Sequence, residues 1–368
     1  MPFFGAKRQL KQLQDQLRRA SARVEELERQ NSRIETILES MIEGVVVLDA
    51  DTRILSINTS VEKIFGVQKK ETQGRLFLEA IRNNGIAEII DNVLKEAKLI
   101  TRELSLVWPI QKSFQVNASP ILENGAAKGC LLVIHDITEI RKLEIVRRDF
   151  VANVSHELKT PLTSIKGFVE TLLEGALEDK ENNRSFLKII HDHTERLNNL
   201  VDDLLSLAHL ESKEITLDKS DFNLGRQLKE IVLGFGSQLK KKNIQISNEL
   251  PASLIINSDK GRIDQVLTNL IDNAIKFNTE NGHIKIYCQD SNDKIKIFVE
   301  DSGFGIPGKD IPRIFERFYR VDKARSRELG GTGLGLSIVK HIIDLHGGSV
   351  GVESTEGLGS KFWFTLPK

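Results

Sequence analysis

The stretch DFVANVSHELKTPLTSIKGF, residues 149–168, determines how the second half of this chain is interpreted. At about 100° per residue of an α-helix, its apolar residues fall on one face. His156 lies roughly 170° from the centre of that face, and Thr160, one turn further on, shares its side of the helix. We therefore expect the histidine to point away from the packed side, although an ordinary solvent-facing histidine would look the same. The apolar face consists of Phe150, Val151, Val154, Leu158, Leu162 and Ile165.

Two neighbours of His156 suggest a chemical role for it. Glu157 could orient the imidazole or take its proton during a nucleophilic attack, and an ordinary surface acid is the alternative. Pro161 has no N–H to donate to the carbonyl of Glu157, so we expect the helix to be weakened or bent just after the histidine. A neutral histidine has a free lone pair. The segment therefore predicts a nucleophile, provided that a phosphate donor lies elsewhere in the chain.

The composition excludes some classes of function. The 368 residues include 52 Lys plus Arg and 52 Asp plus Glu, so the formal net charge is zero and nothing points to nucleic acid as a partner. Cys130 and Cys288 form no metal or redox motif, which favours core residues of a reduced, intracellular protein. The apolar runs are shorter than the ~18 residues of a membrane helix. We therefore expect a cytoplasmic chain and leave open an anchor outside it.

Residues 1–33 are expected to form a coiled coil or signalling helix. Two apolar seams follow a heptad spacing through residues 7–41, and Asn31 in one seam is typical of a residue that fixes the register of a parallel dimer. A single amphipathic helix that lies on the next domain is the alternative. The seams read Leu10, Leu17, Val24, Asn31, Leu38 and Leu13, Ala20, Leu27, Ile34, Met41.

Residues 34–139 predict a small α+β domain. Five strand-like runs are present, with helical segments between the second and third. This order, and the triplet Asp136-Ile137-Thr138 before a helix, resemble a PAS sensor domain. The resemblance implies a sensing or dimerising module whose signal is a small molecule or a protein. His135 is interpreted as a structural histidine and not as a haem ligand.

Residues 140–216 predict an antiparallel hairpin of two long helices. The polar run EDKENNR, residues 178–184, separates them. Two such helices cannot bury both apolar stripes alone, whereas a homodimer that makes a four-helix bundle would bury them. The stripe of the second helix consists of Phe186, Ile190, Leu197, Leu200, Leu204 and Leu207.

Residues 217–368 predict an α/β sandwich with an unusual helix at 261–277. Asn269 and Asn273 are four residues apart on this helix, and Lys276 follows. Asparagine is a poor helix former, so two on one face need a reason. Amide oxygens suit Mg²⁺ and a lysine suits phosphate, although a solvated polar face is an equally good alternative from this helix alone.

Two glycine-containing segments follow. In VEDSGFGIP, Asp301 ends a strand, and its carboxylate could accept a hydrogen bond from an adenine amino group; an ordinary β-turn is the alternative. In GGTGLGLSIVKHI, the glycines expose backbone N–H groups before a helix, which favours phosphate binding without a P-loop. The preceding FERFYRVDKARSRE, residues 315–328, is typical of a mobile lid. The glycines of the second segment are Gly330, Gly331, Gly333 and Gly335.

These motifs occur in the order H-E-L-K-T-P, N-x-x-x-N-x-x-K, D-x-G-x-G, F-x-x-F and G-x-G-L-G. Over residues 140–368 the series closely resembles the sensor histidine kinases of two-component systems. The nucleotide motifs also resemble the gyrase/Hsp90/MutL ATPases, but Asn269 stands where those hydrolases place a water-activating glutamate. Within the family, residues 147–179 look most like phosphate-regulon sensor kinases.

The resemblance implies roles for individual residues. His156 is the phospho-acceptor and Glu157 assists it, while Thr160 positions water for dephosphorylation of a response regulator. Arg317 helps to position the γ-phosphate. ATP and Mg²⁺ are the implied cofactors, with Asn273 and Asn269 as metal ligands. The implied nucleotide contacts are Asn269, Asn273, Lys276, Phe277, Asp301, Gly303, Gly305, Phe318, Gly331, Thr332, Gly333, Leu334 and Gly335.

The resemblance thus implies an ATP-dependent histidine autokinase, active as a homodimer, that phosphorylates the receiver domain of a response regulator. A regulator phosphatase or ATP-sensing adaptor with vestigial autokinase activity is one alternative, and phosphate on His156 would separate it. A protein-serine kinase or ATPase of the same fold group is another. Hydrolysis that persists in His156→Ala, or phosphoserine on a partner, would support that second alternative.

Overall fold

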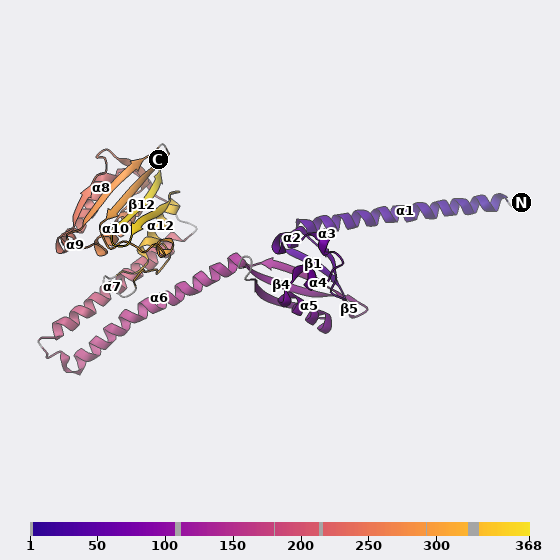
Figure 1. Ribbon diagram of the computed structural model, residues 1–368, viewed down its shortest axis with the longest axis horizontal. Coiled ribbons are helices and arrows are strands. Elements are labelled where there is room, and N and C mark those ends of the chain that lie inside the picture. The colour runs from indigo at the N-terminus through magenta and orange to yellow at the C-terminus, as the bar shows by residue number, and fades with distance from the viewer. Residues whose placement is uncertain (1–2, 107–111, 180, 213–215, 292, 323–330) are drawn as a thin grey trace. The chain divides into compact units, whose positions relative to one another are not determined.

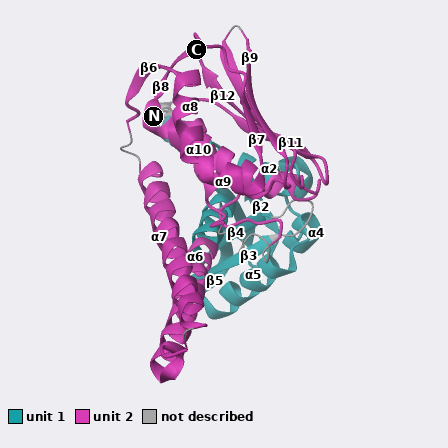
Figure 2. Cartoon of the chain, turned by 90° about the vertical axis from the view of Figure 1, so that its left-hand side faces the viewer, with its two compact units in different colours: residues 1–148 teal, residues 149–368 magenta. Residues whose placement is uncertain are grey.

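The computed structural model describes residues 3–106, 112–179, 181–212, 216–291, 293–322 and 331–368. The chain divides into two compact units, Met1–Arg148 and Asp149–Lys368 (Figure 2), and each is described by itself. Within the described ranges, no helix combines the length and the apolar character that a membrane span requires.

The first unit begins with one long helix, α1, Phe3–Ser40 (Figure 1). The predicted helix is therefore confirmed, and it extends beyond the expected boundary at residue 33. Leu17, Val24, Leu27 and Ile34 of the two seams are exposed on it. Exposed apolar residues at heptad spacing suit a contact with a second helix, and the coiled coil itself stays a prediction.

The predicted α+β domain is confirmed as a five-stranded antiparallel sheet in the order β2-β1-β5-β4-β3. Helices lie between the second and third strands, and the longest of them packs its apolar face on the sheet. The strands are β1 Gly44–Asp49, β2 Ile54–Ile57, β3 Ile100–Leu106, β4 Lys112–Glu123 and β5 Ala126–Asp136. The helices are α2 Thr59–Phe65, α3 Lys69–Thr72, α4 Phe77–Ile81 and α5 Asn84–Glu96.

Asn58 fixes the end of α1 to this domain. Its side-chain oxygen accepts hydrogen bonds from the backbone N–H groups of Val45 (3.0 Å) and Val61 (3.2 Å). Its side-chain nitrogen donates to the carbonyls of Leu38 (3.0 Å) and Glu43 (2.8 Å). One buried amide therefore joins α1, β1 and α2.

The second unit contains the predicted helical hairpin. Its first helix, α6, covers Thr138–Thr171 and therefore begins in the first unit, and its second, α7, covers Asn183–Leu210. Helix α6 continues through Pro161, which is buried. The weakening or bend expected just after His156 stays a prediction. The α-helical geometry first ends at the π-helical turn Leu172–Ala176, where Gly175 has a φ of 125°.

The remainder of the second unit is the predicted α/β sandwich. Its main sheet has the order β11-β12-β10-β9-β7, and only the β7–β9 pair is parallel. Helices α8, α10 and α12 cover one face. The strands are β6 Lys219–Asn223, β7 Gln245–Asn248, β8 Ile255–Asp259, β9 His283–Asp290, β10 Lys294–Asp301, β11 Val350–Thr355 and β12 Gly359–Pro367. The helices are α8 Leu224–Gly234, α9 Gly236–Lys242, α10 Lys260–Lys276, the short 3₁₀ turn Ile311–Arg313 and α12 Gly335–Leu345.

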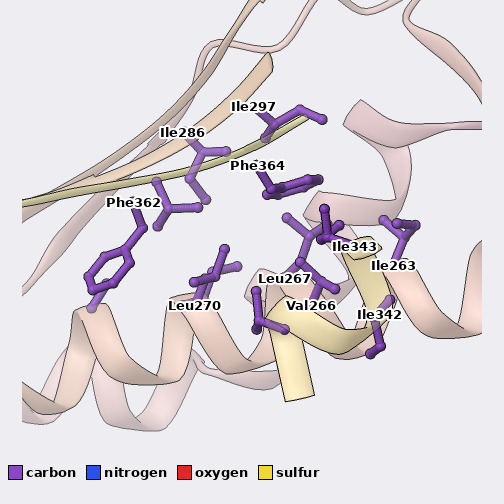
Figure 3. Close-up of a cluster of buried hydrophobic side chains, with 14 of the residues drawn as sticks. Ile263, Val266, Leu267, Leu270, Ile286, Ile297, Ile342, Ile343, Phe362 and Phe364 are labelled. Atoms are coloured by element: carbon purple, nitrogen blue, oxygen red, sulfur yellow. The ribbon is translucent and has the colours of Figure 1, made fainter. Parts of the chain in front are cut away.

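The core of this sandwich fixes the rotation of α10 about its axis. Ile263, Val266, Leu267 and Leu270 point from α10 toward the sheet and α12 (Figure 3). Ile286 and Ile297 meet them from β9 and β10, where inward-facing residues alternate along each strand. The opposite, polar face of α10 is therefore held in one orientation.

Three leucines of α7 belong to the same core. Leu200, Leu207 and Leu210 are buried in one cluster with the apolar residues of α10 and α12. Their spacing places them on one face of α7. The hairpin and the sandwich are thus docked through a shared apolar contact.

Lys242 of α9 caps the C-terminal end of α10. Its ammonium group donates hydrogen bonds to the carbonyls of Ile275 (2.9 Å) and Lys276 (2.8 Å). A cation is favourable here because the last carbonyls of a helix lack helical partners and carry partial negative charge.

We predict that Lys242→Met lowers the free energy of unfolding of the sandwich by about 1–3 kcal/mol, because it leaves part-buried carbonyls unpaired. Urea unfolding of the full chain measures this change. Lys241→Met, at the exposed neighbouring position, is the matched control and should change stability by less than about 0.5 kcal/mol. Equal losses in the two variants would contradict the cap.

Candidate functional site

A cavity of about 690 Å³ lies in the second unit beside the polar face of α10. We call it the α10 cavity. Its walls come from α10, the end of β10, the segment before α12, and α7 of the hairpin. The predicted residues that line it are Asn269, Asn273, Lys276, Phe277, Asp301, Gly305, Gly331, Thr332, Gly333 and Gly335.

The floor of the cavity is the polar face of α10. The helix starts at a cap in which the Asp259 side chain accepts from the backbone N–H of Arg262 at 3.1 Å. Asn269 and Asn273 follow on the face opposite the core, and Lys276 forms an ion pair with Asp272 at 2.7 Å. Two amide groups and an ammonium group therefore face one space.

Asp301 is a buried carboxylate at the end of β10, with 7% of its surface exposed. Burial raises its pKa to about 6, although hydrogen bonds from the N–H groups of Gly303 and Ser360 oppose the rise. Gly303 itself has no room for a side chain, because a Cβ would lie 2.2 Å from the carbonyl oxygen of Phe277. This close approach holds the turn after β10 against the end of α10.

The glycine segment passes into α12. Gly333 has a φ of +77°, a conformation that other residues rarely adopt. A Cβ on Gly335 would lie 3.0 Å from the Asn269 side-chain oxygen, so the backbone approaches α10 closely. Leu334 points into the core instead of the cavity, and Gly330 lies outside the described residues. The helix start and the polar face of α10 together suit an anion.

Residues of the segment predicted as a lid contact two different parts of the second unit, the hairpin and the α10 cavity. Phe318 lies 5.8 Å from the ring of Phe150 of α6, and Arg317 stacks on the same ring and pairs with Glu211. These two predicted site residues therefore contact the hairpin, and the cavity lining contains Arg320 instead. Residues 323–328 of the expected lid lie outside the described ranges.

Arg320 is a site residue that the sequence did not distinguish. Its side chain is 6% exposed, and one guanidinium nitrogen donates to Glu157 (3.0 Å) and to the carbonyl of Thr332 (2.9 Å). Within the described part of the chain, its Nε is buried without a hydrogen-bond acceptor. A buried cation with a spare N–H at the cavity suits an anionic ligand.

His156 projects into solvent, as expected, with 64% of its side chain exposed. Its Nδ1 lies 3.9 Å from a carboxylate oxygen of Glu157. The other oxygen of Glu157 accepts from Arg196 of α7 (3.2 Å) and from Arg320. The hydroxyl of Thr160 donates to the carbonyl of His156 at 3.1 Å. Among the described residues, the cavity lining does not include His156.

The second helix of the hairpin also contributes to the cavity, which the sequence did not predict. Asn199, Asp202 and Asp203 of α7 line it, and the hydroxyl of Thr332 donates to Asp203 at 2.7 Å. The apolar stripe of α7 had indicated only a bundle helix. A contact between positions 129 residues apart leaves no signal in a single sequence.

The α10 cavity suits an elongated ligand with an aromatic ring at one end and negative charge at the other. Phe277 and Asp301 mark one end, where Phe304, Ile306 and Phe362 add apolar surface. Asn269 lies eight positions before Phe277, which is about 12 Å along a helix. It faces the glycine segment there. A nucleoside triphosphate has this distribution of chemistry.

Comparison with known families agrees with this geometry. Residues 32–137 match the PAS fold, and residues 146–213 match the His Kinase A (phospho-acceptor) domain. Residues 258–368 match the histidine kinase-, DNA gyrase B- and HSP90-like ATPase. The three matches follow the predicted order and cover both the hairpin and the cavity.

Individual relatives are sensor kinases. The chain is 36% identical over 349 residues to the sensor histidine kinase WalK of Bacillus subtilis, covering 92% of the chain and 56% of the relative. It is 33% identical over 355 residues to a sensor protein kinase WalK of Staphylococcus aureus, covering 92% and 82%. The chain spans about half the length of several of the curated relatives that it matches.

A solved structure of the histidine kinase ThkA, in complex with the response regulator protein TrrA, matches with a TM-score of 0.51 and 30% identity. It covers 90% of this chain and 98% of that one. The resemblance to phosphate-regulon kinases stays a prediction, since the curated relatives carry the name WalK. The matches over nearly the whole chain nevertheless agree on one family. This chain belongs to the sensor histidine kinases.

Proposed function

We propose that the chain is an ATP-dependent protein-histidine autokinase, which phosphorylates its own His156 and passes the phosphoryl group to an aspartate of a response regulator. One observation carries the proposal. The same compact unit holds an exposed histidine beside a carboxylate and a cavity suited to a nucleoside triphosphate. The match of residues 258–368 to an ATPase model supports ATP as that nucleotide.

The organisation that we propose follows the sequence boundaries. Residues 1–33 are the coiled coil, 34–139 the PAS-like sensor domain, 140–216 the dimerisation and phosphotransfer domain, and 217–368 the catalytic ATP-binding domain. Exposed leucines on both helices of the hairpin, including Leu162 and Leu205, support a homodimer with a four-helix bundle. The complex of ThkA with a response regulator supports a receiver domain as the partner.

We assign the parts of the nucleotide to the residues around the α10 cavity. Asp301 would accept from the adenine amino group, with Phe277 beside the ring and Gly303 and Gly305 shaping the turn. Lys276 and the N–H groups of the glycine segment would contact the phosphates. Asn273 and Asn269 would hold Mg²⁺ through their amide oxygens, and the ion would neutralise phosphate charge. Among the described residues, no cluster of three acidic, histidine or cysteine side chains offers a different metal site.

In the reaction, a ring nitrogen of His156 forms a bond to the γ-phosphorus of ATP, while the bond from that phosphorus to the bridging oxygen breaks and ADP leaves. Because Nδ1 faces Glu157 at 3.9 Å, we assign the attack to Nε2 and the loss of the Nδ1 proton to Glu157. Lys276 and Arg320 would stabilise the charge on the transferring group.

The phosphoryl group then passes from His156 to an aspartate carboxylate of the response regulator. Thr160, one turn from His156 and exposed, would position water when the same surface removes the phosphoryl group from the regulator.

The docked hairpin has to move for this chemistry. His156 is not at the cavity lining, and Glu157 is engaged by Arg196 and Arg320. A repositioning of the sandwich relative to the hairpin would bring the γ-phosphate to His156, as a rigid-body motion about a few connecting residues. The direction of the loop at residues 175–184 would decide whether the acceptor histidine is in the same or the partner subunit.

The central test is autophosphorylation. Incubation with labelled ATP and Mg²⁺ should leave phosphate on the chain that is labile in acid and stable in base. His156→Gln should abolish it, because glutamine has no nucleophilic ring nitrogen, whereas His191→Gln, at an exposed histidine of α7, should retain it. A native chain that binds ATP without any label would favour a regulator phosphatase or ATP-sensing adaptor instead.

The pKa of about 6 at Asp301 predicts a pH dependence of nucleoside binding. Burial has raised this pKa, so the carboxylate that accepts from adenine is present above pH 6 and is protonated below it. We expect the Kd for adenosine to rise by about tenfold between pH 7.5 and pH 5. Calorimetry with adenosine measures this without titrating phosphate groups. Asp301→Asn should bind weakly at both pH values, and a flat profile in the native chain would contradict the assignment.

The two lid arginines should differ in importance. Arg320→Met is expected to lower the autophosphorylation rate by about 100-fold or more, as expected for loss of a cation at a transferring phosphoryl group. Arg317→Met removes a contact to Glu211 and Phe150 outside the cavity, and we expect a loss below about tenfold. Initial rates at saturating ATP measure both, and a larger loss for Arg317→Met would return the phosphate role to that residue.

A further inference from the structure

Asp203 is the point at which the hairpin enters the phosphate end of the α10 cavity. Its carboxylate accepts the Thr332 hydroxyl at 2.7 Å, and Thr332 stands inside the glycine segment. Three charged groups of the cavity surround it. Lys276 of α10 favours its anionic form, whereas Asp202 and Asp272 oppose that form. Burial, the largest of these influences, raises its pKa.

The groups around Asp203 are also those that would bind a phosphate group. A hydroxyl donor, a lysine and the start of α12 converge on the same region, and all of them favour an anion. In the docked hairpin, a carboxylate of α7 already uses the hydroxyl and is attracted by the lysine. A triphosphate that entered would meet this fixed negative charge.

Packing outside the cavity fixes the position of Asp203 and so maintains its contact with Thr332. Leu200 and Leu207, on either side of Asp203 along α7, are buried in the shared core. Ser206 accepts a hydrogen bond from Gln265 of α10 at 2.8 Å. Asp203 therefore cannot retreat from the cavity while α7 remains docked, because its helix is fixed on the same face.

We propose that Asp203 is an autoinhibitory contact through which the docked hairpin weakens the binding of nucleoside triphosphates. The proposal rests on the nucleotide site of the proposed function and adds its regulation. Docking of α7 places the carboxylate at the phosphate end, and release of α7 removes it. Since such coupling is reciprocal, bound ATP favours release of the hairpin to the same degree that docking weakens ATP.

The effect depends on ligand charge, which provides an internal control. Repulsion by Asp203 should be strongest for ATP, smaller for ADP and absent for adenosine. A change of hairpin contact that acted through the adenine end would affect all three ligands equally.

The test compares Asp203→Asn with Asp202→Asn in the full chain. Both variants remove one negative charge from a residue that lines the cavity, but only the first removes it from the side chain that accepts the Thr332 hydroxyl. Calorimetric titration without Mg²⁺ should show ATP binding about tenfold tighter in Asp203→Asn, as expected for one nearby charge screened by a partly wet site. ADP should tighten less, and adenosine should be unchanged. Asp202→Asn should alter ATP binding by less than about twofold.

A second measurement follows the contact without nucleotide. Hydrogen exchange of the amides at residues 331–335 should be several-fold faster in Asp203→Ala, which has no acceptor for the Thr332 hydroxyl, than in the native chain, and unchanged in Asp202→Ala. Thr332→Val should speed this exchange likewise, but it keeps the carboxylate and should tighten ATP less than Asp203→Asn does.

Three results would overturn the proposal: weaker or unchanged ATP binding in Asp203→Asn, equal tightening in the two aspartate variants, or equal effects on ATP and adenosine. Failure of the proposed function has a different signature. A native chain that binds neither adenosine nor ATP would remove the nucleotide site itself, and with it any inhibition by Asp203. Normal nucleotide binding without phosphate on His156 would remove the kinase activity and leave the inhibitory contact supported by the binding data.

Discussion

The burial of one face of α10 is the constraint on which the rest of the second unit depends. Ile263, Val266, Leu267 and Leu270 fix the rotation of the helix against the sheet, and only this rotation turns Asn269 and Asn273 toward the cavity. The capped ends of the helix keep the same axis in place. The asparagines are costly for a helix, and their place on its cavity-facing side agrees with the nucleotide contact that we propose for them.

The same apolar cluster extends to α7, and this has a consequence for the site as a whole. Part of the cavity wall belongs to the hairpin, so a movement of the hairpin relative to the sandwich would change the shape of the cavity. The contacts that join the two parts include buried leucines, the carboxylate of Glu157 between Arg196 and Arg320, and the Asp203–Thr332 hydrogen bond. The apolar contact involves no group that would bind a nucleotide, whereas the polar contacts involve groups that a triphosphate would also contact. Such an interface is well suited to respond to the ligand.

Much of the architecture was predictable from the sequence because its signals are local. Heptad spacing gave α1, alternation gave the strands, and helical spacing gave α6, α7 and α10. Much of the cavity lining was also predicted, because Asn269, Asn273 and Asp301 belong to motifs with a recognisable spacing. Close backbone approaches at Gly303 and Gly335 leave little room for a side chain, so glycine is recognisable there too.

What could not be predicted depends on contacts between distant segments. Arg313, Arg317 and Arg320 look equivalent in sequence, and only the packing of Phe318 on Phe150 turns Arg320 toward the cavity and Arg317 toward the hairpin. Asp203 has no local signal, because its partner lies in another domain.

The hydrogen bonds of Asn58 restrict which residue types can replace it in the first unit. Its amide uses two acceptor and two donor interactions, all with backbone groups of α1, β1, α2 and Glu43, which immediately precedes β1. Aspartate would have no N–H for the carbonyls of Leu38 and Glu43, and serine is too short to reach all four groups. Neighbouring positions can drift while their bonds remain, because backbone atoms are common to every residue type. One side chain therefore fixes the position at which α1 meets the sheet. A substitution of Asn58 would leave backbone groups near α1, β1 and α2 without their hydrogen-bond partner.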